Sequence, residues 1–446
     1  MADTVVLQQF IRINQDADVS SLALQRKRYP NLSDSDFRFA LQQIDGRQRS
    51  RDKHPSFVAT PGWLFPPKLN LEQSSSELTA RFKASLIEPL GIHTLIDATG
   101  GYGVDTFYMS AHAHVTHYFE QNTDLAALAE HNFRLTHHDS IHVHPTPFTP
   151  AQLSIVNRNS HIVNHKSYIV NHKSYIVNHK SYIVNRKSYI LYLDPSRRDT
   201  HGGKVFRLDD CTPNVLDILS SPEVRDLHPH ILLKLSPMLD ISQALAQLSA
   251  IPALAEWGTQ WQVYVVSIHN EVKELLLLSG QTRAIVGSIL GFTRTFSLSF
   301  TPEEEQSAIP VYMPSMPPQE LCGWYIYEPD AAIRKAGAFR LLSARYHLYK
   351  ADVNTHLYLA PAAEAFDAVP TPGRLWRIDA VASHAKELLT DTGLNKAHIL
   401  TRNYPLTSDA LRHKLRLQEG QDTSIIGCRI AGNPLLLRCT PVFSGF

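Results

Sequence analysis

Short apolar runs alternate with helical segments through the middle of the chain, and this pattern predicts a sheet covered by helices. The runs predicted as strands are 92–96, 115–119, 141–144, 189–193, 231–235, 261–267 and 272–278. A helix is predicted over 124–134. Repeated strand–helix units indicate a mostly parallel, seven-stranded sheet with helices on both faces. The link Ile268-His-Asn-Glu271 is so short that the last two strands should be antiparallel neighbours.

The pattern changes on either side of this region, and the changes predict further domains. Residues 1–85 indicate helices, including one capped at Ser33 and a second capped at Ser76 or a neighbour. Prolines cluster between Ile309 and Pro318, as in a linker, and Pro370-Thr-Pro-Gly373 marks another boundary. We therefore predict a helical region at 1–85, an α/β domain at 86–290, and two small α+β domains at 291–368 and 369–446.

A heptad repeat interrupts the α/β domain at 155–189. Four copies of Ile-Val-Asn-His-Lys-Ser-Tyr follow one another over 162–189, with Arg186 in place of histidine in the last. The apolar residues of each copy are consecutive, so they form no coiled-coil stripe. Near-identical copies favour a passive insertion in a surface connection over a functional element.

Composition excludes some classes of protein. The 446 residues include 43 basic and 42 acidic side chains, a formal net charge of +1. Such a balanced chain does not bind nucleic acid through bulk charge, so any such contact must be local. Cys211, Cys322, Cys428 and Cys439 are far apart and form no C-x-x-C pair, which favours reduced, buried thiols. No apolar run approaches the length of a membrane span, so we expect a soluble, cytoplasmic protein.

The candidate chemistry begins at Asp97-Ala-Thr-Gly-Gly-Tyr-Gly-Val-Asp105, between the first strand and a helix. Glycines 100, 101 and 103 would allow a ligand to approach the backbone, and the first helical N–H groups would face it. Glu120 ends the second strand, where a carboxylate can accept both hydroxyls of a ribose. These features predict a site for an adenosine cofactor.

The loop fits S-adenosylmethionine better than a nicotinamide dinucleotide. The G-x-G-x-x-G pattern would require glycine at 106, where Thr106 stands. Carboxylates at Asp97 and Asp105 would repel a diphosphate, but they suit the positive charges of a sulfonium amino acid. We interpret Asp97, Thr99, the three glycines, Asp105 and Glu120 as cofactor-binding.

A second motif, Asp194-Pro-Ser-Arg-Arg-Asp199, follows the fourth strand. Ligands of open α/β sheets lie outside the carboxyl ends of the strands, so this loop should face the transferred methyl group. We predict Asp194, Ser196 and Arg197 as catalytic. The alternative is an Asp-Pro turn with solvated arginines. Lys234, after the fifth strand, is either catalytic or a cap on the sheet edge.

Together these residues resemble a class I S-adenosylmethionine-dependent methyltransferase family with ferredoxin-like and THUMP-like C-terminal domains. The resemblance covers nearly the whole chain. It rests on the two motifs above and on five further motifs. They are Leu71-Glu-Gln-Ser-Ser-Ser-Glu77, Gly202-Gly-Lys204, Lys234-Leu-Ser-Pro-Met-Leu-Asp240, Tyr327-Glu-Pro-Asp330 and Lys335-Ala-Gly337. The resemblance implies a Rossmann-like catalytic domain and S-adenosylmethionine as cofactor, with Gln73 folding over it or merely capping a helix.

The appended domains imply an RNA substrate, either tRNA or rRNA. Arg402, Tyr404, Arg412 and Lys414 form the best basic and aromatic patch for single-stranded RNA, although a solvated helix face is equally consistent. Cys211 is poorly placed for a thiol adduct, so a base nitrogen is the expected acceptor. The stretch after the third strand, Ile141-His-Val-His-Pro-Thr-Pro147, lacks the acid that relatives carry for adenine.

Two other functions stay open. One is a catalytically idle RNA-binding protein with the same fold. The other is a methyltransferase that acts on a protein or a small molecule.

Overall fold

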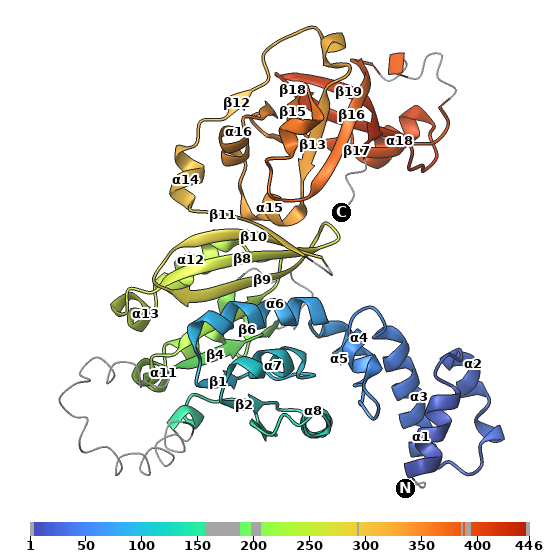
Figure 1. Ribbon diagram of the computed structural model, residues 1–446, viewed down its shortest axis with the longest axis vertical. Coiled ribbons are helices and arrows are strands. Elements are labelled where there is room, and N and C mark those ends of the chain that lie inside the picture. Colours follow the sequence, from blue (N-terminus) through green and yellow to red (C-terminus); the bar gives the residue numbers. More distant parts are fainter. Residues whose placement is uncertain are drawn as a thin grey trace. The chain divides into compact units, whose positions relative to one another are not determined.

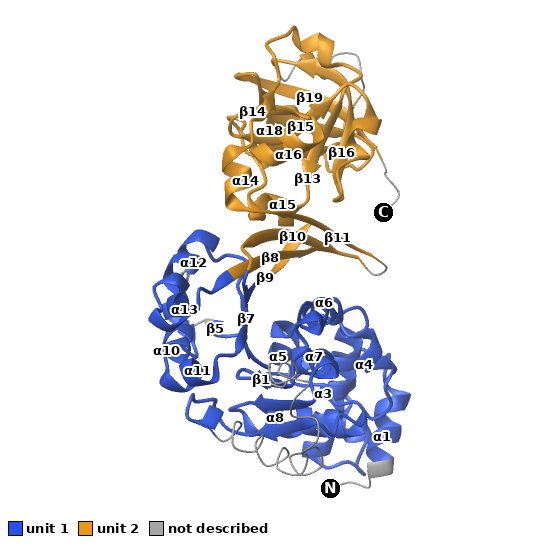
Figure 2. Ribbon diagram, turned by 60° about the vertical axis from the view of Figure 1, so that its left-hand side comes forward, with its two compact units in different colours: residues 1–260, 277–281 blue, residues 261–276, 282–446 orange. Residues whose placement is uncertain are grey.

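The computed structural model describes residues 4–154, 156, 188–197, 207–291, 294–384, 387–388 and 394–442. Most of the heptad insertion and the end of the second motif, Arg198 and Asp199 with Gly202-Gly-Lys204, lie outside this part. The chain divides into two compact units, coloured in Figure 2. The first comprises 1–260 with 277–281, and the second comprises 261–276 with 282–446.

Helices of the first unit precede and connect its strands (Figure 1). They are α1 Thr4–Ile13, α2 Val19–Leu24, α3 Asp34–Arg49, α4 Pro55–Ala59, α5 Lys68–Gln73, α6 Glu77–Ile87, α7 Val104–Met109, α8 Thr123–Leu135, α10 Val215–Leu219, α11 Pro222–Leu227, α12 Ile241–Ser249 and α13 Pro252–Glu256, with 3-10 turns η1 Arg26–Arg28, η2 Glu88–Leu90, η3 Ser110–His112 and η4 Leu208–Asp210. The predicted caps are confirmed. The Ser33 hydroxyl accepts from Asp36 N at 3.1 Å, and the Ser76 hydroxyl accepts from Thr79 N at 3.2 Å.

All seven predicted runs form strands, and four further strands occur among the described residues of this region. They are β1 Thr94–Asp97, β2 Val115–Phe119, β3 Ile141–His144, β4 Tyr189–Leu193, β5 Ser196–Arg197, β6 Cys211–Thr212, β7 His230–Leu235, β8 Gln260–Ile268, β9 Glu271–Gly280, β10 Ala284–Leu290 and β11 Thr295–Phe300. His269 and Asn270 join β8 to β9 with positive φ angles, as a two-residue hairpin turn requires.

The main sheet has the strand order β11-β10-β8-β9-β7-β4-β1-β2-β3. The mixed α/β prediction is confirmed, but β10 and β11 extend the expected seven strands to nine among the described residues. β1 lies between β2 and β4 and is parallel to both, and Asp97 pairs in register with Tyr118 and with Tyr192. The loops that follow these three strands therefore leave the sheet at one edge.

The second unit contains a further sheet, with the order β12-β14-β15-β13-β16-β19-β18-β17. Its elements are α14 Pro302–Ser307, β12 Val311–Tyr312, η5 Pro318–Leu321, β13 Tyr325–Pro329, α15 Ala331–Ala336, α16 Arg340–Tyr346, β14 Tyr349–Asp352, β15 Thr355–Ala360, η6 Ala363–Phe366, β16 Gly373–Ala382, β17 His398–Arg402, α18 Ser408–Leu415, β18 Ser424–Ile430 and β19 Asn433–Pro441. This sheet curves, because β14 and β15 also approach β18, and β15 approaches β17.

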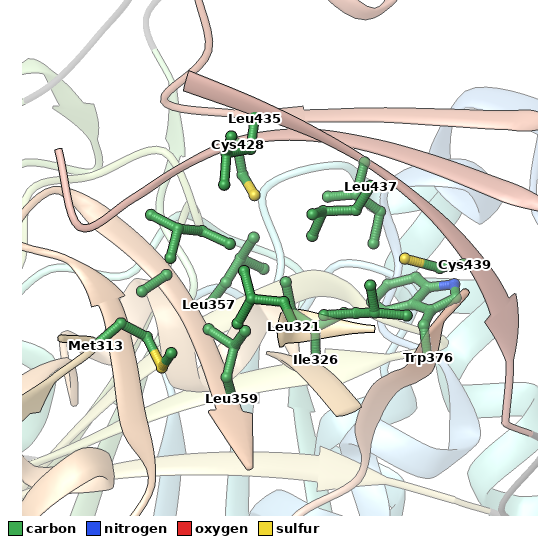
Figure 3. Packing of buried hydrophobic residues seen from close by; sticks show 14 of the residues in the cluster. Met313, Leu321, Ile326, Leu357, Leu359, Trp376, Cys428, Leu435, Leu437 and Cys439 are labelled. Carbon is green, nitrogen blue, oxygen red and sulfur yellow. The ribbon is translucent and has the colours of Figure 1, made fainter. Parts of the chain in front are cut away.

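The curved sheet encloses its own hydrophobic core (Figure 3). Ile326, Leu357 and Trp376 pack there with Cys428 and Cys439. The Trp376 indole donates to Ser424 Oγ at 3.0 Å, which satisfies its buried N–H. One core therefore includes strands from β13 to β19, on both sides of the boundary predicted near Pro370.

The cysteines are free, and Cys211, Cys428 and Cys439 are buried as expected, whereas Cys322 is exposed. Burial raises the pKa of the Cys428 thiol to about 12, so that thiol stays protonated. Across the described ranges, the helices are all too short or too polar to span a bilayer.

Candidate functional site

The glycine loop between β1 and α7 is ordered by its neighbours in the first unit. Gly100 N donates to Phe119 O at 2.8 Å, and Tyr118 OH donates to Gly101 O at 2.5 Å. A Cβ on Gly100 would lie 2.2 Å from the Tyr118 ring, and one on Gly103 would lie 2.7 Å from the Phe133 ring. Packing within the protein therefore requires glycine at these two positions.

Gly101 differs from Gly100 and Gly103, because the space that a Cβ would occupy is open. Its φ is +58°, and the nearest atom to an added Cβ is Thr99 O at 3.8 Å. A ligand can approach the backbone here, as expected for the whole loop. The explanation predicted from the sequence therefore applies to Gly101 alone, while Gly100 and Gly103 are required by Tyr118 and Phe133.

Glu120, at the end of β2, connects this loop to the next strand. Its Oε2 accepts from Gly101 N at 2.8 Å, and its Oε1 accepts from Asn122 N at 2.7 Å. The side chain is half-buried, at the same sheet edge as Gly101. The carboxylate thus lies where the sequence predicts a ribose ligand, and it is bonded to the loop itself.

Asp97 is buried beneath the loop. Its carboxylate accepts from Thr99 N at 2.9 Å and, in a short contact, from the Thr106 hydroxyl. Burial raises the pKa of Asp97 to about 7, although the two hydrogen bonds oppose this. Asp97 therefore fixes the conformation of the glycine loop. The same two hydrogen bonds limit where a cofactor can contact the Asp97 carboxylate.

Asp105, predicted to bind cofactor, is the centre of a buried charge network. Its Oδ2 accepts from Ser75 Oγ at 2.7 Å and Tyr192 OH at 2.6 Å. Lys83 Nζ lies 3.1 Å from Oδ1, and Lys234 Nζ lies 3.9 Å from Oδ2. Burial would raise the pKa of Asp105, but the two ammonium groups outweigh it and lower the pKa. Its charge is therefore compensated within the protein.

Asp194 joins this network from the end of β4. Lys234 Nζ donates to Asp194 Oδ2 at 2.5 Å, and Asp194 N donates to Thr99 Oγ1 at 2.7 Å. Burial raises the pKa of Asp194, Lys234 opposes that rise, and Asp105 adds to it. The Asp194 side chain is 34% exposed, so it can meet a substrate while anchored to the glycine loop. Thr99 provides that anchor.

The other predicted catalytic residues lie in a short ladder. Ser196 and Arg197 form β5, which pairs with Cys211 and Thr212 of β6. The exposed Ser196 hydroxyl donates to Thr212 O at 3.1 Å. Only the backbone of Arg197 is described. Cys211 is buried against Arg207 O, which is unfavourable for a thiol nucleophile.

The N-terminal region contributes Ser75 to the site. Gln73, predicted at the cofactor, is exposed at the end of α5. Ser75 is buried, and its hydroxyl reaches Asp105. Lys83 Nζ also donates to Ser75 Oγ at 3.2 Å. The inward-facing contact of this motif is thus made by Ser75, two residues after the predicted Gln73.

His54 fixes this serine segment. Its Nε2 donates to Ser75 O at 2.8 Å, and its ring stacks on Phe57 with centroids 5.6 Å apart. Phe57 in turn stacks on Trp63 at 3.9 Å, and the Trp63 indole donates to Tyr102 OH at 2.6 Å. Aromatic packing therefore connects the N-terminal helices to the glycine loop, which contains Tyr102.

The pH dependence of stability should report on His54. Burial lowers its pKa to about 4 from an unfolded value near 6.5. The folded state therefore binds fewer protons between these values. The contribution of neutral His54 is full above pH 6.5 and is lost as the pH falls through 4, a change of roughly 3 kcal/mol.

Thermal unfolding of wild type and His54→Gln between pH 4 and 7.5 (roughly the window that these pKa values define) measures this. We expect the stability advantage of wild type to shrink as the pH falls. His413→Gln, at an exposed histidine, should follow wild type. A difference in stability between wild type and His54→Gln that does not change with pH would rule out this effect of His54 titration.

The residues of the predicted basic and aromatic patch each have different neighbours in the second unit. Arg412 pairs with Glu419, and Tyr404 packs against Gly427, where an added Cβ would lie 2.9 Å from its ring. Lys414 is exposed, and Arg402 bonds to the buried Glu328.

Comparison with known proteins supports the predicted domain types. Residues 325–366 match a family described as a ferredoxin-like domain, and residues 373–441 match one described as THUMP domain-like. The chain is 25% identical over 247 residues to uncharacterized S-adenosylmethionine-dependent methyltransferases from two strains of Mycobacterium tuberculosis. That match covers 54% of this chain and 61% of each relative, so the chain spans about three fifths of their length.

A crystal structure from Porphyromonas gingivalis W83, assigned as a methyltransferase, shares the fold over nearly the full length. The TM-score is 0.76 with 24% sequence identity, and the match covers 98% of both chains. The resemblance inferred from the motifs is confirmed. The chain has the fold of that structure, is related to proteins named S-adenosylmethionine-dependent methyltransferases, and carries ferredoxin-like and THUMP-like segments.

Proposed function

We propose that this protein is an S-adenosylmethionine-dependent methyltransferase that modifies a base nitrogen in a structured RNA, tRNA or rRNA. The observation that carries the proposal is the meeting of three loops at one edge of the main sheet. Gly101 bonds to Glu120, and Thr99 bonds to Asp194, so the ends of β1, β2 and β4 are linked directly. Ligands of such sheets lie outside these strand ends.

The residues present suit the cofactor. Gly101 offers an open backbone, Glu120 a half-buried carboxylate for ribose hydroxyls, and the Asp194 carboxylate is one-third exposed. When bound, S-adenosylmethionine would supply an activated methyl group on a positively charged sulfur. Two accessible acids near the open glycine favour that charge and disfavour a diphosphate.

Asp194 is the proposed contact with the acceptor base. Its Oδ2 is held by Lys234, whereas Oδ1 accepts no hydrogen bond from the residues that the structure describes. An exocyclic amino group could donate to Oδ1 and be oriented by it. Lys234 holds the carboxylate in place and opposes the rise in its pKa that burial causes. The protein would then act mainly by positioning and by excluding water.

The substrate class rests on the C-terminal unit. Its THUMP-like segment supports RNA as the partner, and the buried Cys211 disfavours a thiol adduct with a pyrimidine carbon. Transfer of the labelled methyl group from S-adenosylmethionine into RNA tests the proposal. RNA from a strain lacking this gene should be labelled, and RNA from the parent strain should not.

The alternatives give different results in the same assay. Label in protein or small molecules, but not in RNA, would contradict the substrate class. Absence of label, combined with intact RNA binding, would support an idle RNA-binding protein.

A further inference from the structure

Four elements of the second unit bring charged side chains together around Glu328. This glutamate lies near the end of β13, and its side chain is 1% exposed. Its Oε1 accepts from Arg402 Nε at 2.5 Å and lies 3.5 Å from Arg334 Nη1. Its Oε2 accepts from Arg374 Nε at 2.9 Å and makes a short contact with Arg374 Nη2. The arginines come from α15, β16 and β17.

This arginine cluster, Arg334, Arg374 and Arg402, carries more positive charge than Glu328 neutralises. Three guanidinium groups face Glu328, and the further carboxylate Asp330 acts on Arg334, so three positive and two negative charges leave a local charge of +1. Asp330 is buried, and its Oδ1 accepts from Ser267 Oγ and Ala332 N, so it is held apart from an external ligand. Burial, together with Lys350 and Arg334, lowers the pKa of the neighbouring His356 to about 4, so His356 adds no charge at neutral pH.

The arginine cluster is partly exposed to solvent, and Glu328 does not satisfy all of its N–H donors. The Arg334, Arg374 and Arg402 side chains are 29%, 35% and 32% exposed. Arg334 Nε is buried and has no hydrogen-bond partner in the described part of the chain. One carboxylate could be satisfied by two guanidinium groups, so the third is in excess of what Glu328 needs. Glu328 fixes the arginines, and an external anion would compensate the remaining charge.

We propose that the arginine cluster binds a phosphate of the RNA backbone. This rests on the proposed function for the choice of RNA, whereas the preference for a phosphate follows from the cluster itself. Guanidinium groups present planar, forked donors that match phosphate oxygens. A buried carboxylate that holds three of them in place reduces the freedom lost on binding.

Fluorescence anisotropy of the full chain with labelled, unfractionated tRNA, over a series of KCl concentrations and without methyl donor, tests the cluster. Arg374→Gln with Arg402→Gln should weaken binding by about tenfold or more, and should reduce the slope of log affinity against log salt by about 1. The matched control is Arg345→Gln with Arg377→Gln, which removes the same charge from the same unit. Those arginines each pair with a single acid, Glu304 or Asp379.

The results separate the possibilities. Equal weakening by both double variants would overturn the proposal, because bulk charge would explain it. Displacement of tRNA from wild type by inorganic phosphate, beyond the effect of KCl at equal ionic strength, would support a phosphate site that tRNA and the free anion share. Binding of inorganic phosphate that Arg374→Gln with Arg402→Gln abolishes, with unchanged affinity for tRNA, would assign the cluster to a free anion and overturn the proposal. Circular dichroism checks folding, and the single variants replace the double variant if it unfolds. Loss of methyl transfer with the cluster effect intact would count only against the proposed function.

Discussion

Asp194→Asn is expected to lower kcat/KM for methyl transfer by about 100-fold or more, while S-adenosylmethionine binding changes little. The substitution removes the negative charge that Lys234 holds at 2.5 Å, and with it the strongest acceptor for a substrate amino group. The backbone bond from residue 194 to Thr99 remains, so the glycine loop should keep its shape. Steady-state kinetics on RNA from the deletion strain, with calorimetric titration of the cofactor, measure both quantities.

Asp226→Asn is the matched control, because Asp226 is an exposed aspartate of the same unit. It should leave kcat/KM unchanged. If Asp194→Asn has the kcat/KM of wild type, Asp194 has no role in the reaction. The proposed contact between Asp194 and the acceptor base would then be wrong.

Lys83→Met is expected to lower the free energy of unfolding by about 3–5 kcal/mol. The Lys83 side chain is fully buried, and its Nζ lies 3.1 Å from Asp105 Oδ1. In wild type, Lys83 and Lys234 balance Asp105 and Asp194, so the variant leaves two acids with one ammonium group. Urea unfolding followed by circular dichroism measures the loss.

Two further variants make this result specific. Lys68→Met removes an exposed lysine that lies 3.7 Å from Glu72, and it should cost about 0.5 kcal/mol or less. Lys83→Met with Asp105→Asn should recover part of the loss, since the uncompensated charge is gone. If Lys83→Met is as stable as Lys68→Met, Asp105 does not depend on Lys83 for compensation of its charge.

Local patterns predicted the main sheet well because its strands are short, apolar and bounded by polar loops. The predicted run 115–119 coincides with β2, and the helix predicted at 124–134 is α8, Thr123–Leu135. β10 and β11 were not predicted. Pairing places them in the same sheet, with β10 parallel to β8, and such pairing depends on contacts between distant residues that no local pattern records.

The rule that ligands lie at the carboxyl ends of strands was enough to predict that Glu120 and Asp194 would approach the glycine loop. It did not predict the contacts of Asp105 with Ser75, Lys83 and Tyr192, which come from the turn before α6, from α6 and from β4 respectively. Burial of Asp105 by remote side chains is a tertiary property, so the sequence could indicate a candidate ligand contact but not the internal ion pairs of this carboxylate.

The central claim is that the glycine loop and Glu120 hold S-adenosylmethionine, and calorimetric titration of the full chain tests it most directly. Wild type should bind one molecule per chain, and Glu120→Ala should bind at least about tenfold more weakly. Asp226→Asn should match wild type. Absence of heat and of any thermal shift with wild type, or unchanged affinity in Glu120→Ala, would contradict the account.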